Sequence, residues 1–351
     1  MNLLTDDWLR VIGADGRILP LSPPRIGSGE IRDLHAPRAD FRGALYQFLI
    51  GLLQTACTPE NRKAWLAWWR TPPSTDELKK RFAPFLDAFE LISENGRPAF
   101  MQDLDMPDGE PKQIATLLID APGGKTLRDN LDHFVKRGTV EKISPHWAAT
   151  ALFTLQINAP SGGVGHRVSL RGGGPLTTLV LPPEGGDRDT LWHRLWLNVL
   201  TGEELARLPG NGALKNQSAI FPWLATTRTS GKKGSETWPE QVHPLQVFWC
   251  MPRRIRLDAP DREGGICDLD GRPATALLHG YRTRNHGINY AGSWEHPLTP
   301  YVREAGKENL TIKGQPGGLG YRHWLGLVVE ESAGKQHRVP ATVVRAWQQS
   351  R

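Results

Sequence analysis

Residues 41–57 read FRGALYQFLIGLLQTAC, and this stretch sets the centre of the fold. Its apolar residues recur at the three- and four-residue spacing of a helix, which predicts a buried helix with Asp40 as its N-cap. Neither this run nor any other in the chain reaches the ~20 apolar residues that a membrane-spanning helix needs. The stretch therefore predicts a core helix, and no contact with a membrane is expected.

The segments on either side of this helix predict a mixture of strands and helices. Because they follow one another without a regular strand–helix–strand period, the expected fold class is α+β, with mainly one large mixed domain over residues 1–351. Polar stretches rich in glycine and proline predict long loops at residues 106–138, 159–175 and 207–240, of a kind that often carries function. The expected helices cover residues 59–70, 75–91 with a kink at Pro84, 144–157, 190–200 and 340–349; the expected strands cover residues 2–12, 176–181, the first half of 245–257, a hairpin over 280–302, and 321–329.

The composition favours a cytoplasmic protein with an anionic partner. Hydrophobic residues make up 39% of the 351 residues, which suffices for a packed core. The formal net charge of +6 and the isoelectric point of ≈ 9.3 favour nucleic acid, although many basic proteins bind none. Cys57, Cys250 and Cys267 have no disulfide or metal-ligand spacing, which indicates a reducing cytoplasm. The N-terminus has no basic segment followed by an apolar one, so no signal peptide is expected.

Motifs of known enzyme classes are absent or incomplete in this sequence. Gly123, Gly124 and Lys125 resemble the end of a phosphate-binding loop, but that pattern needs a glycine where Ile119 stands. Neither the HExxH motif of zinc proteases nor the GxSxG motif of serine hydrolases occurs. We therefore expect a binding protein without a cofactor. An unrelated nucleic-acid-modifying enzyme or hydrolase with a dispersed active site is the alternative.

Residues 159–175 read APSGGVGHRVSLRGGGP and contain six glycines. Glycine allows a positive φ and lets a ligand approach the backbone where no side chain intervenes. Arg167 and Arg171 lie between two glycine clusters, so bare amide donors and guanidinium charge are available together for a phosphate backbone. Two tight turns around a strand, with two solvated arginines, explain the same pattern equally well.

Further basic residues are candidates for contact with a nucleic-acid backbone. Some have an ordinary structural explanation as well, such as hairpin charges that face water, or a phenylalanine that anchors its own loop. The candidates are Arg282 and Arg284 with Tyr281, Asn285 and His286; Arg253, Arg254 and Arg256; Lys136 and Arg137 after Phe134; and Arg228, Lys232 and Lys233 in the loop at residues 207–240.

Five segments, in this order, resemble the large subunit of the type I-E CRISPR Cascade complex, the CasA family. The resemblance covers essentially the whole chain, and the first segment is specific when it occurs together with the LRGGxPxTT block of the third. The segments are NLLTDDWLRV from Asn2, ISPHWAATALFTLQ from Ile143, APSGGVGHRVSLRGGGPLTTLV from Ala159, VFWCMPRRIRL from Val247 and GSWEHPLTPYV from Gly292.

The resemblance implies a subunit that is not itself a nuclease. It implies a place beside the 5′ handle of the guide CRISPR RNA and recognition of a short protospacer-adjacent motif in double-stranded DNA, largely through the minor groove. It also implies a part in opening the duplex into an R-loop and in recruiting the helicase-nuclease for antiviral defence, with sequence reading left to guide–target pairing. The other implied partners are the backbone, handle-binding and small subunits of Cascade.

The resemblance also assigns expected roles to single residues. The family's lysine finger lies near Asn285, where this chain has no lysine, so Arg282, Arg284 or Asn285 is expected to replace it. The aromatic contact to the guide handle aligns with Phe134. The glycine loop, whose bare backbone would press into the minor groove, falls on Ser161, Gly162, Gly163, Val164 and Gly165. The expected contacts to the DNA or RNA backbone are Lys136, Arg137, Arg167, Arg228, Lys232 and Lys233.

Two departures from the family pattern change these expectations. Some relatives bind zinc through paired cysteines near residues 144–146 and 267–270; those cysteines are missing here, so no metal is expected. The family continues into a glutamine-bearing wedge and a C-terminal helical bundle, whereas this sequence ends at Arg351. The expected form is an N-terminal domain without the C-terminal four-helix bundle, and a replacement nuclease domain on another subunit is one way to supply what is missing.

Overall fold

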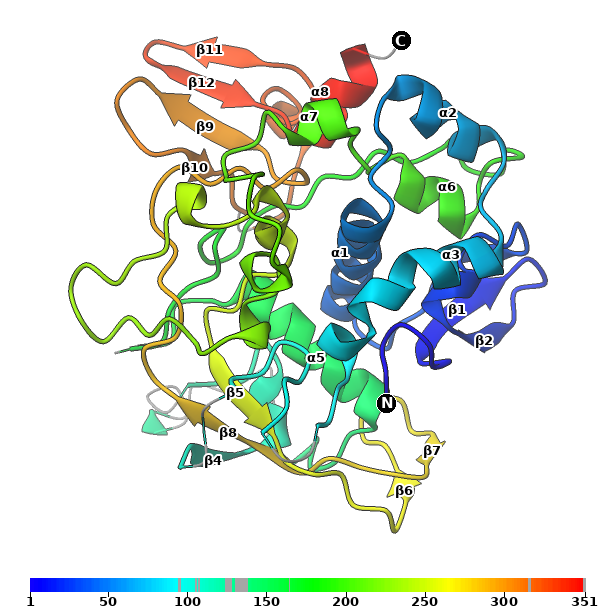
Figure 1. The fold of residues 1–351 in the computed structure, drawn as a ribbon, viewed down its shortest axis with the longest axis vertical. Coiled ribbons are helices and arrows are strands. Elements are labelled where there is room, and N and C mark those ends of the chain that lie inside the picture. The colour runs from blue at the N-terminus through cyan, green and yellow to red at the C-terminus, as the bar shows by residue number, and fades with distance from the viewer. Residues whose placement is uncertain are drawn as a thin grey trace.

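Helix α1 (Ala39–Ala56) lies at the centre of the molecule and packs beside helix α5 (Pro145–Asn158), as seen in the computed structural model (Figure 1). Most residues of both helices are buried whichever way they point, which is typical of helices enclosed by the rest of a protein. The helix predicted at residues 41–57 is therefore confirmed as the central element. The structure describes residues 1–93, 96–104, 106, 108–123, 128–129, 138–163, 165–314 and 317–349.

Short helices and small antiparallel sheets surround this central pair. This mixture confirms the α+β class. The other helices in the described part of the chain are α2 (Arg62–Arg70), α3 (Thr75–Phe82), α6 (Leu191–Trp196), α7 (Gly202–Leu205) and α8 (Thr342–Gln349). One sheet has the strand order β2 (Ile18–Leu21), β1 (Leu9–Gly13), β3 (Ile31–Leu34), and a second has the order β4 (Glu110–Gln113), β8 (Gly280–Arg284), β5 (Arg254–Leu257). A third sheet has the order β10 (Leu310–Thr311), β9 (Tyr301–Glu304), β12 (Gln336–Val339), β11 (Glu331–Ala333). The strands β6 (Gly265–Ile266) and β7 (Pro273–Ala274) form a separate pair.

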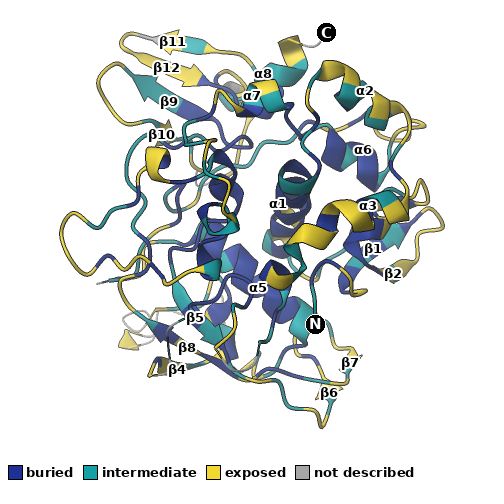
Figure 2. Cartoon of the chain, viewed as in Figure 1, coloured by how far each residue is buried: buried dark blue, intermediate teal, exposed yellow. Residues whose placement is uncertain are grey.

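An aromatic cluster fills the space around α1. Phe48 of α1 makes edge-to-face contacts with Trp8, Phe153 and Trp249, whose ring centroids lie 5.3, 5.5 and 5.8 Å away. Such contacts add to the stabilisation that comes from removing these large rings from water. The cluster gathers residues from both ends of the sequence, and Figure 2 shows the resulting buried interior around α1 and α5. Of the described helices, none combines the length and the apolar character needed to cross a membrane.

Arg171 is a core residue, which contradicts the idea that it is available for a phosphate backbone. Only 2% of it is exposed, and its guanidinium donates to Gln47 of α1 at 2.6 Å and to Asn158 of α5 at 3.1 Å. The hydroxyls of Thr177 and Thr299 accept further bonds from it, each at 3.1 Å. Burial lowers the pKa of Arg171. Its role is to fasten the glycine-rich segment to the two central helices.

The start of α1 and the end of α3 differ from the predicted helix boundaries. Asp40 does not cap α1, because Arg38 occupies the N-cap and Asp40 pairs with it at 2.9 Å. The helix predicted over residues 75–91 ends at Phe82, where a 3-10 turn takes over around Pro84. Proline has no N–H to continue the helix, so it ends the helix here instead of kinking it.

Several predicted strands are wrong, because the pairing depends on distant segments. The first half of residues 245–257 forms a 3-10 helix that begins at Pro244, and only the second half forms β5. Residues 280–302 form no hairpin, since β8 lies between β4 and β5 while β9 belongs to another sheet. Residues 176–181 make single backbone bonds to Ile312 and Leu298 without forming a strand, and residues 321–329 begin with a 3-10 turn.

Candidate nucleic-acid interface

Three segments that are far apart in the sequence meet at the turn that follows β8. His286 adopts a φ of 62°, which is rare for a residue with a side chain, and its N–H donates to the carbonyl oxygen of Gly165 at 2.8 Å. The carbonyl of His286 accepts from the N–H of Ser230 at 3.1 Å. We call this meeting point the loop junction; it comprises residues 161–163, 165, 230–231 and 285–286.

The glycines of the loop junction serve two different purposes. Gly165 has a φ of 78°, and a Cβ placed there would lie 2.6 Å from the Cβ of Asn285, so only glycine allows this close contact. Gly163 has a φ of 89°, and a Cβ placed there would meet nothing within 4 Å. Because Ser161, Gly162 and Gly163 are all exposed, the loop presents bare backbone to the outside.

Arg253 lies directly behind this bare backbone. Its guanidinium donates to the carbonyl oxygen of Pro160 at 2.5 Å, and a Cβ on Gly162 would lie 2.8 Å from one of its terminal nitrogens. The side-chain amide of Gln156 holds the Arg253 backbone, accepting from its N–H at 3.0 Å and donating to its carbonyl at 2.9 Å. Burial lowers the pKa of Arg253. No carboxylate in the described part of the chain pairs with this guanidinium, so a partly buried positive charge lies uncompensated beneath the loop.

Arg167 braces the junction from within. Its Nε donates to the hydroxyl of Ser230 at 2.7 Å, and a terminal nitrogen donates to the Ser230 carbonyl at 2.9 Å. The Ser230 hydroxyl in turn donates to the carbonyl of Gly287 at 2.7 Å. In this structure Arg167 therefore fixes the glycine-rich segment to residues 230 and 287.

Arg282 and Arg284 lie on the wetter face of β8 and have acidic neighbours. Tyr281 and Thr283 alternate with them and are buried, which is the pattern of a strand with one solvated face. The Arg282 guanidinium lies 4.0 Å from Asp258. The Arg284 guanidinium lies 3.4 Å from Asp108. The two carboxylates reduce the charge that these arginines offer to a ligand.

The structure brings some of the predicted residues to the junction and leaves others apart. Lys232 and Lys233 are exposed and directly follow Gly231, so they extend the junction with positive charge. Arg228 is exposed too, but it donates to Gln241 at 2.6 Å. The remaining predicted contacts, Val164, Phe134, Lys136 and Arg137, lie outside the described residues.

Sequence patterns gave incomplete signals for the residues that hold the junction. Arg253 stood out only as one of three arginines near a strand, and its neighbours have other partners: Arg254 pairs with Asp103 and Arg256 donates to Ser93. Nothing in the sequence marked Ser230 or the positive φ of His286, because both depend on contacts between distant segments. His166 also lies near Arg253. Burial, and then the positive charge of Arg253, lower the pKa of His166.

The two segments over residues 144–146 and 267–270, at which the resemblance raised the question of a zinc site, lie side by side. The Ser144 hydroxyl donates to the thiol of Cys267 at 3.7 Å, and the indole of Trp147 donates to Asp270 at 2.7 Å. Burial lowers the pKa of His146 to about 4. Within the described residues, no three His, Cys, Asp or Glu side chains gather where they could hold a metal ion. Hydrogen bonds join the segments here.

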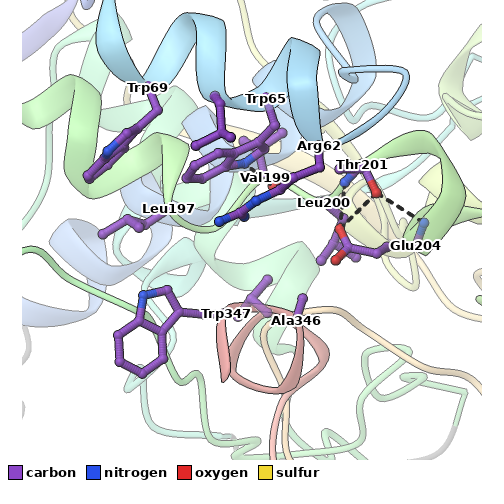
Figure 3. Close-up of a pocket in the computed structure, with 12 residues that line it drawn as sticks. Arg62, Trp65, Trp69, Leu197, Val199, Leu200, Thr201, Glu204, Ala346 and Trp347 are labelled. Atoms are coloured by element: carbon purple, nitrogen blue, oxygen red, sulfur yellow. Dashed lines mark hydrogen bonds between the residues drawn. The ribbon is translucent and has the colours of Figure 1, made fainter. Parts of the chain in front are cut away.

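A hollow of ≈ 200 Å³ between α2, α6, α7 and α8 is an aromatic pocket (Figure 3). Trp65 and Trp69 face it from α2 and Trp347 faces it from α8, while the Arg62 guanidinium lies 4.8 Å from the centre of the Trp65 ring. Its carboxylate, Glu204, accepts hydrogen bonds from the N–H and the hydroxyl of Thr201 and so caps α7. Among the described residues that line the pocket, no histidine or cysteine accompanies this acid.

Solved structures with the same fold come from CRISPR systems. CasA of Thermus thermophilus matches 99% of this chain and 64% of its own length, with a TM-score of 0.64 and 19% identity. Cse1 of Thermobifida fusca matches 95% of this chain and 62% of its own length, with a TM-score of 0.65 and 18% identity. A chain of a CRISPR RNA-guided surveillance complex matches 98% of this chain and 67% of its own length, with a TM-score of 0.66 and 13% identity. At such identities the likeness establishes the fold alone. The chain spans about two thirds of the length of these structures.

Sequence comparison extends this likeness over nearly every residue. The family model described as CRISPR-associated protein Cse1 matches residues 2–351. The match includes the central helices, β8 and every residue of the loop junction. The chain belongs to the CRISPR-associated protein Cse1 family.

Proposed function

We propose that this chain is the non-catalytic large subunit of a Cascade complex and recognises a short motif in double-stranded DNA at the loop junction. The observation that carries the proposal is the exposed bare backbone of residues 161–163, with the uncompensated charge of Arg253 directly behind it. A nucleic-acid duplex offers the negative charge that such a site lacks. The fold shared with a chain of a CRISPR RNA-guided surveillance complex supports this assignment.

The geometry of the junction suits the minor groove. That groove is about 6 Å wide and offers few distinguishing groups, so close approach by a slim backbone matters more than long side chains. Gly163 projects no side chain into the space before it, and Ser161 and Gly162 flank it as exposed neighbours. Backbone N–H groups there would donate to base-edge acceptors, while Lys232 and Lys233 would contact phosphates.

Asn285 is the residue that we favour in place of the family's lysine finger. It is exposed and touches the glycine loop through Gly165, and its amide can both donate and accept at a base edge. Arg282 and Arg284 already lie near Asp258 and Asp108, so we assign them to the phosphate backbone. Arg167 has a bracing role, and Arg228 stands further along the same loop as a backbone contact.

The remaining parts of the proposed function follow from family membership. The guide CRISPR RNA would meet Phe134 at its handle, and Lys136 and Arg137 would contact its backbone. The other partners would be the remaining Cascade subunits and a helicase-nuclease or a replacement nuclease domain, and the setting would be the cytoplasm. Support for duplex opening belongs to the same proposal. The alternative is an unrelated nucleic-acid-modifying enzyme or hydrolase with a dispersed active site.

The test adds a single methyl group to the loop. Gly163→Ala places a Cβ in the open space where the groove would lie, and Gly174→Ala is its matched control, since Gly174 also has a positive φ and open space around it. Both variants carry a similar backbone strain of roughly 1–2 kcal/mol. We expect Gly163→Ala to weaken binding of motif-bearing duplex by the assembled complex about tenfold, or about 1.4 kcal/mol. Equal affinities for the two variants would refute the proposal.

A further inference from the structure

A polar hollow of ≈ 260 Å³ lies on another side of α8, between the turn after α7 and strand β9. It shares Glu204 and Ala346 with the aromatic pocket but has a different character. Three separate elements each contribute an arginine to it: Arg207 follows α7, Arg303 belongs to β9 and Arg345 belongs to α8. Arginine groups gathered in this way suit an oxyanion.

The acids of this hollow do not satisfy its arginines. Glu204 is engaged with Thr201, as described above, and Glu295 accepts from both Arg303 at 2.5 Å and Asn309 at 3.2 Å. Arg345 donates only to the hydroxyl of Thr342, at 3.3 Å, in the part of the chain that the structure describes. The Nε atoms of Arg303 and Arg345 are buried there without a partner. Glu295 and Glu330 both act on Arg345 through their negative charge, yet neither carboxylate gives these two buried Nε atoms a hydrogen-bond acceptor.

An exposed aromatic turn is tied to the same helix. Tyr321 is 92% exposed and Trp324 is 60% exposed, and the N–H of Trp324 donates to the carbonyl of Tyr321 at 3.1 Å. Gln348 of α8 donates to the carbonyl of Val328 at 2.7 Å, which fixes this turn beside the helix. Much of the surface of both residues stays in water after folding. They offer flat faces for stacking.

We propose that the arginine hollow and the aromatic turn form a second nucleic-acid site, which binds a single strand. A phosphodiester offers the oxygen acceptors that these guanidinium groups lack, and Arg345 would donate to them. Bases of the same strand would stack on Tyr321 and Trp324, a contact that only unpaired bases can make. The inference rests on the proposed function for its class of partner, nucleic acid, and concerns a surface separate from the loop junction.

The experiment measures the affinity of the chain for labelled oligothymidine across a salt series by fluorescence anisotropy. We expect Tyr321→Ala with Trp324→Ala to weaken binding by about fivefold or more, since stacking is worth about 1–3 kcal/mol per base. We expect Arg345→Gln to reduce the salt slope by about 0.7, the value for one phosphate contact on a single strand. Leu181→Ala and Arg17→Gln, which alter exposed residues elsewhere, are the controls and should match the unaltered chain.

Three outcomes would overturn the inference. The first is that the aromatic double variant and Arg345→Gln bind oligothymidine as their controls do. The second is that inorganic phosphate raises the melting temperature of the unaltered chain but not of Arg345→Gln, while strand affinity is the same in both, which would indicate a site for free oxyanion. The third is a loss of complex assembly with unchanged strand affinity, which would indicate a protein-docking face. Duplex binding by Gly163→Ala tests the loop junction independently, so the two proposals can fail separately.

Discussion

Two arginines near the glycine-rich segment, the buried Arg171 and the half-buried Arg253, have different roles. Arg171 is surrounded by neutral oxygens from Gln47, Asn158, Thr177 and Thr299, so its donors are satisfied within the protein. Arg253 has a partnerless Nε and a guanidinium directly behind an exposed loop. Burial lowers the pKa of both. Hydrogen bonding therefore distinguishes a core arginine from one that is available to a ligand, whereas a lowered pKa does not.

Replacing Arg171 tests its structural role. We expect Arg171→Met to lower the free energy of unfolding by about 3–5 kcal/mol, because it leaves several buried oxygens without donors. Arg167→Met, which alters an arginine of the same segment, should cost only about 1 kcal/mol. Urea denaturation of both variants measures these values. Similar losses for the two would mean that Arg171 is no more important to the core than its neighbour.

At the scale of elements, sequence patterns predicted the buried helices well and the strand pairings poorly. The helices over residues 41–57 and 144–157 were predicted because their apolar residues, and Pro145 at the start of the second helix, lie within the helix itself. The position of β8 depends on β4, which lies about half the chain away in sequence, and on β5. A local sequence pattern cannot indicate which distant strands will pair. The exposed glycine loop was predicted from its composition, but its support by Arg253 and Ser230 arises only from the fold.

The contact between the glycine loop and the turn after β8 can be tested by a pair of substitutions. Gly165→Ala should lower the melting temperature, because residue 165 has a positive φ and its new Cβ would lie 2.6 Å from the Cβ of Asn285. Asn285→Gly removes that obstructing atom, so the double variant should recover part of the loss. A double-mutant cycle of melting temperatures measures the recovery. Strictly additive losses would mean that the two segments do not touch.

At the scale of the whole molecule, buried histidines make the fold sensitive to acid. Burial lowers the pKa of His146 to about 4, and burial and then Arg171 lower that of His296 well below its usual value. Both stay neutral in the folded chain but take up a proton in the unfolded chain below about pH 6.5. Unfolded molecules then bind more protons, so stability falls as the pH drops from 6.5 towards 4. We expect a smaller decline in His146→Gln across that range of pH, measured by thermal unfolding; an unchanged decline would exclude His146 as a cause.

The three cysteines of the chain, Cys57, Cys250 and Cys267, are all buried, which makes a direct test of the central claim practical. A single exposed cysteine introduced as Ser161→Cys can carry a photo-crosslinker without competition from the others. In the assembled complex bound to target duplex, the account predicts crosslinks to the base pairs of the recognition motif, and none from the distant control Arg17→Cys. Crosslinks from position 161 to protein or guide RNA alone, with the duplex bound, would contradict the claim that the loop junction reads DNA.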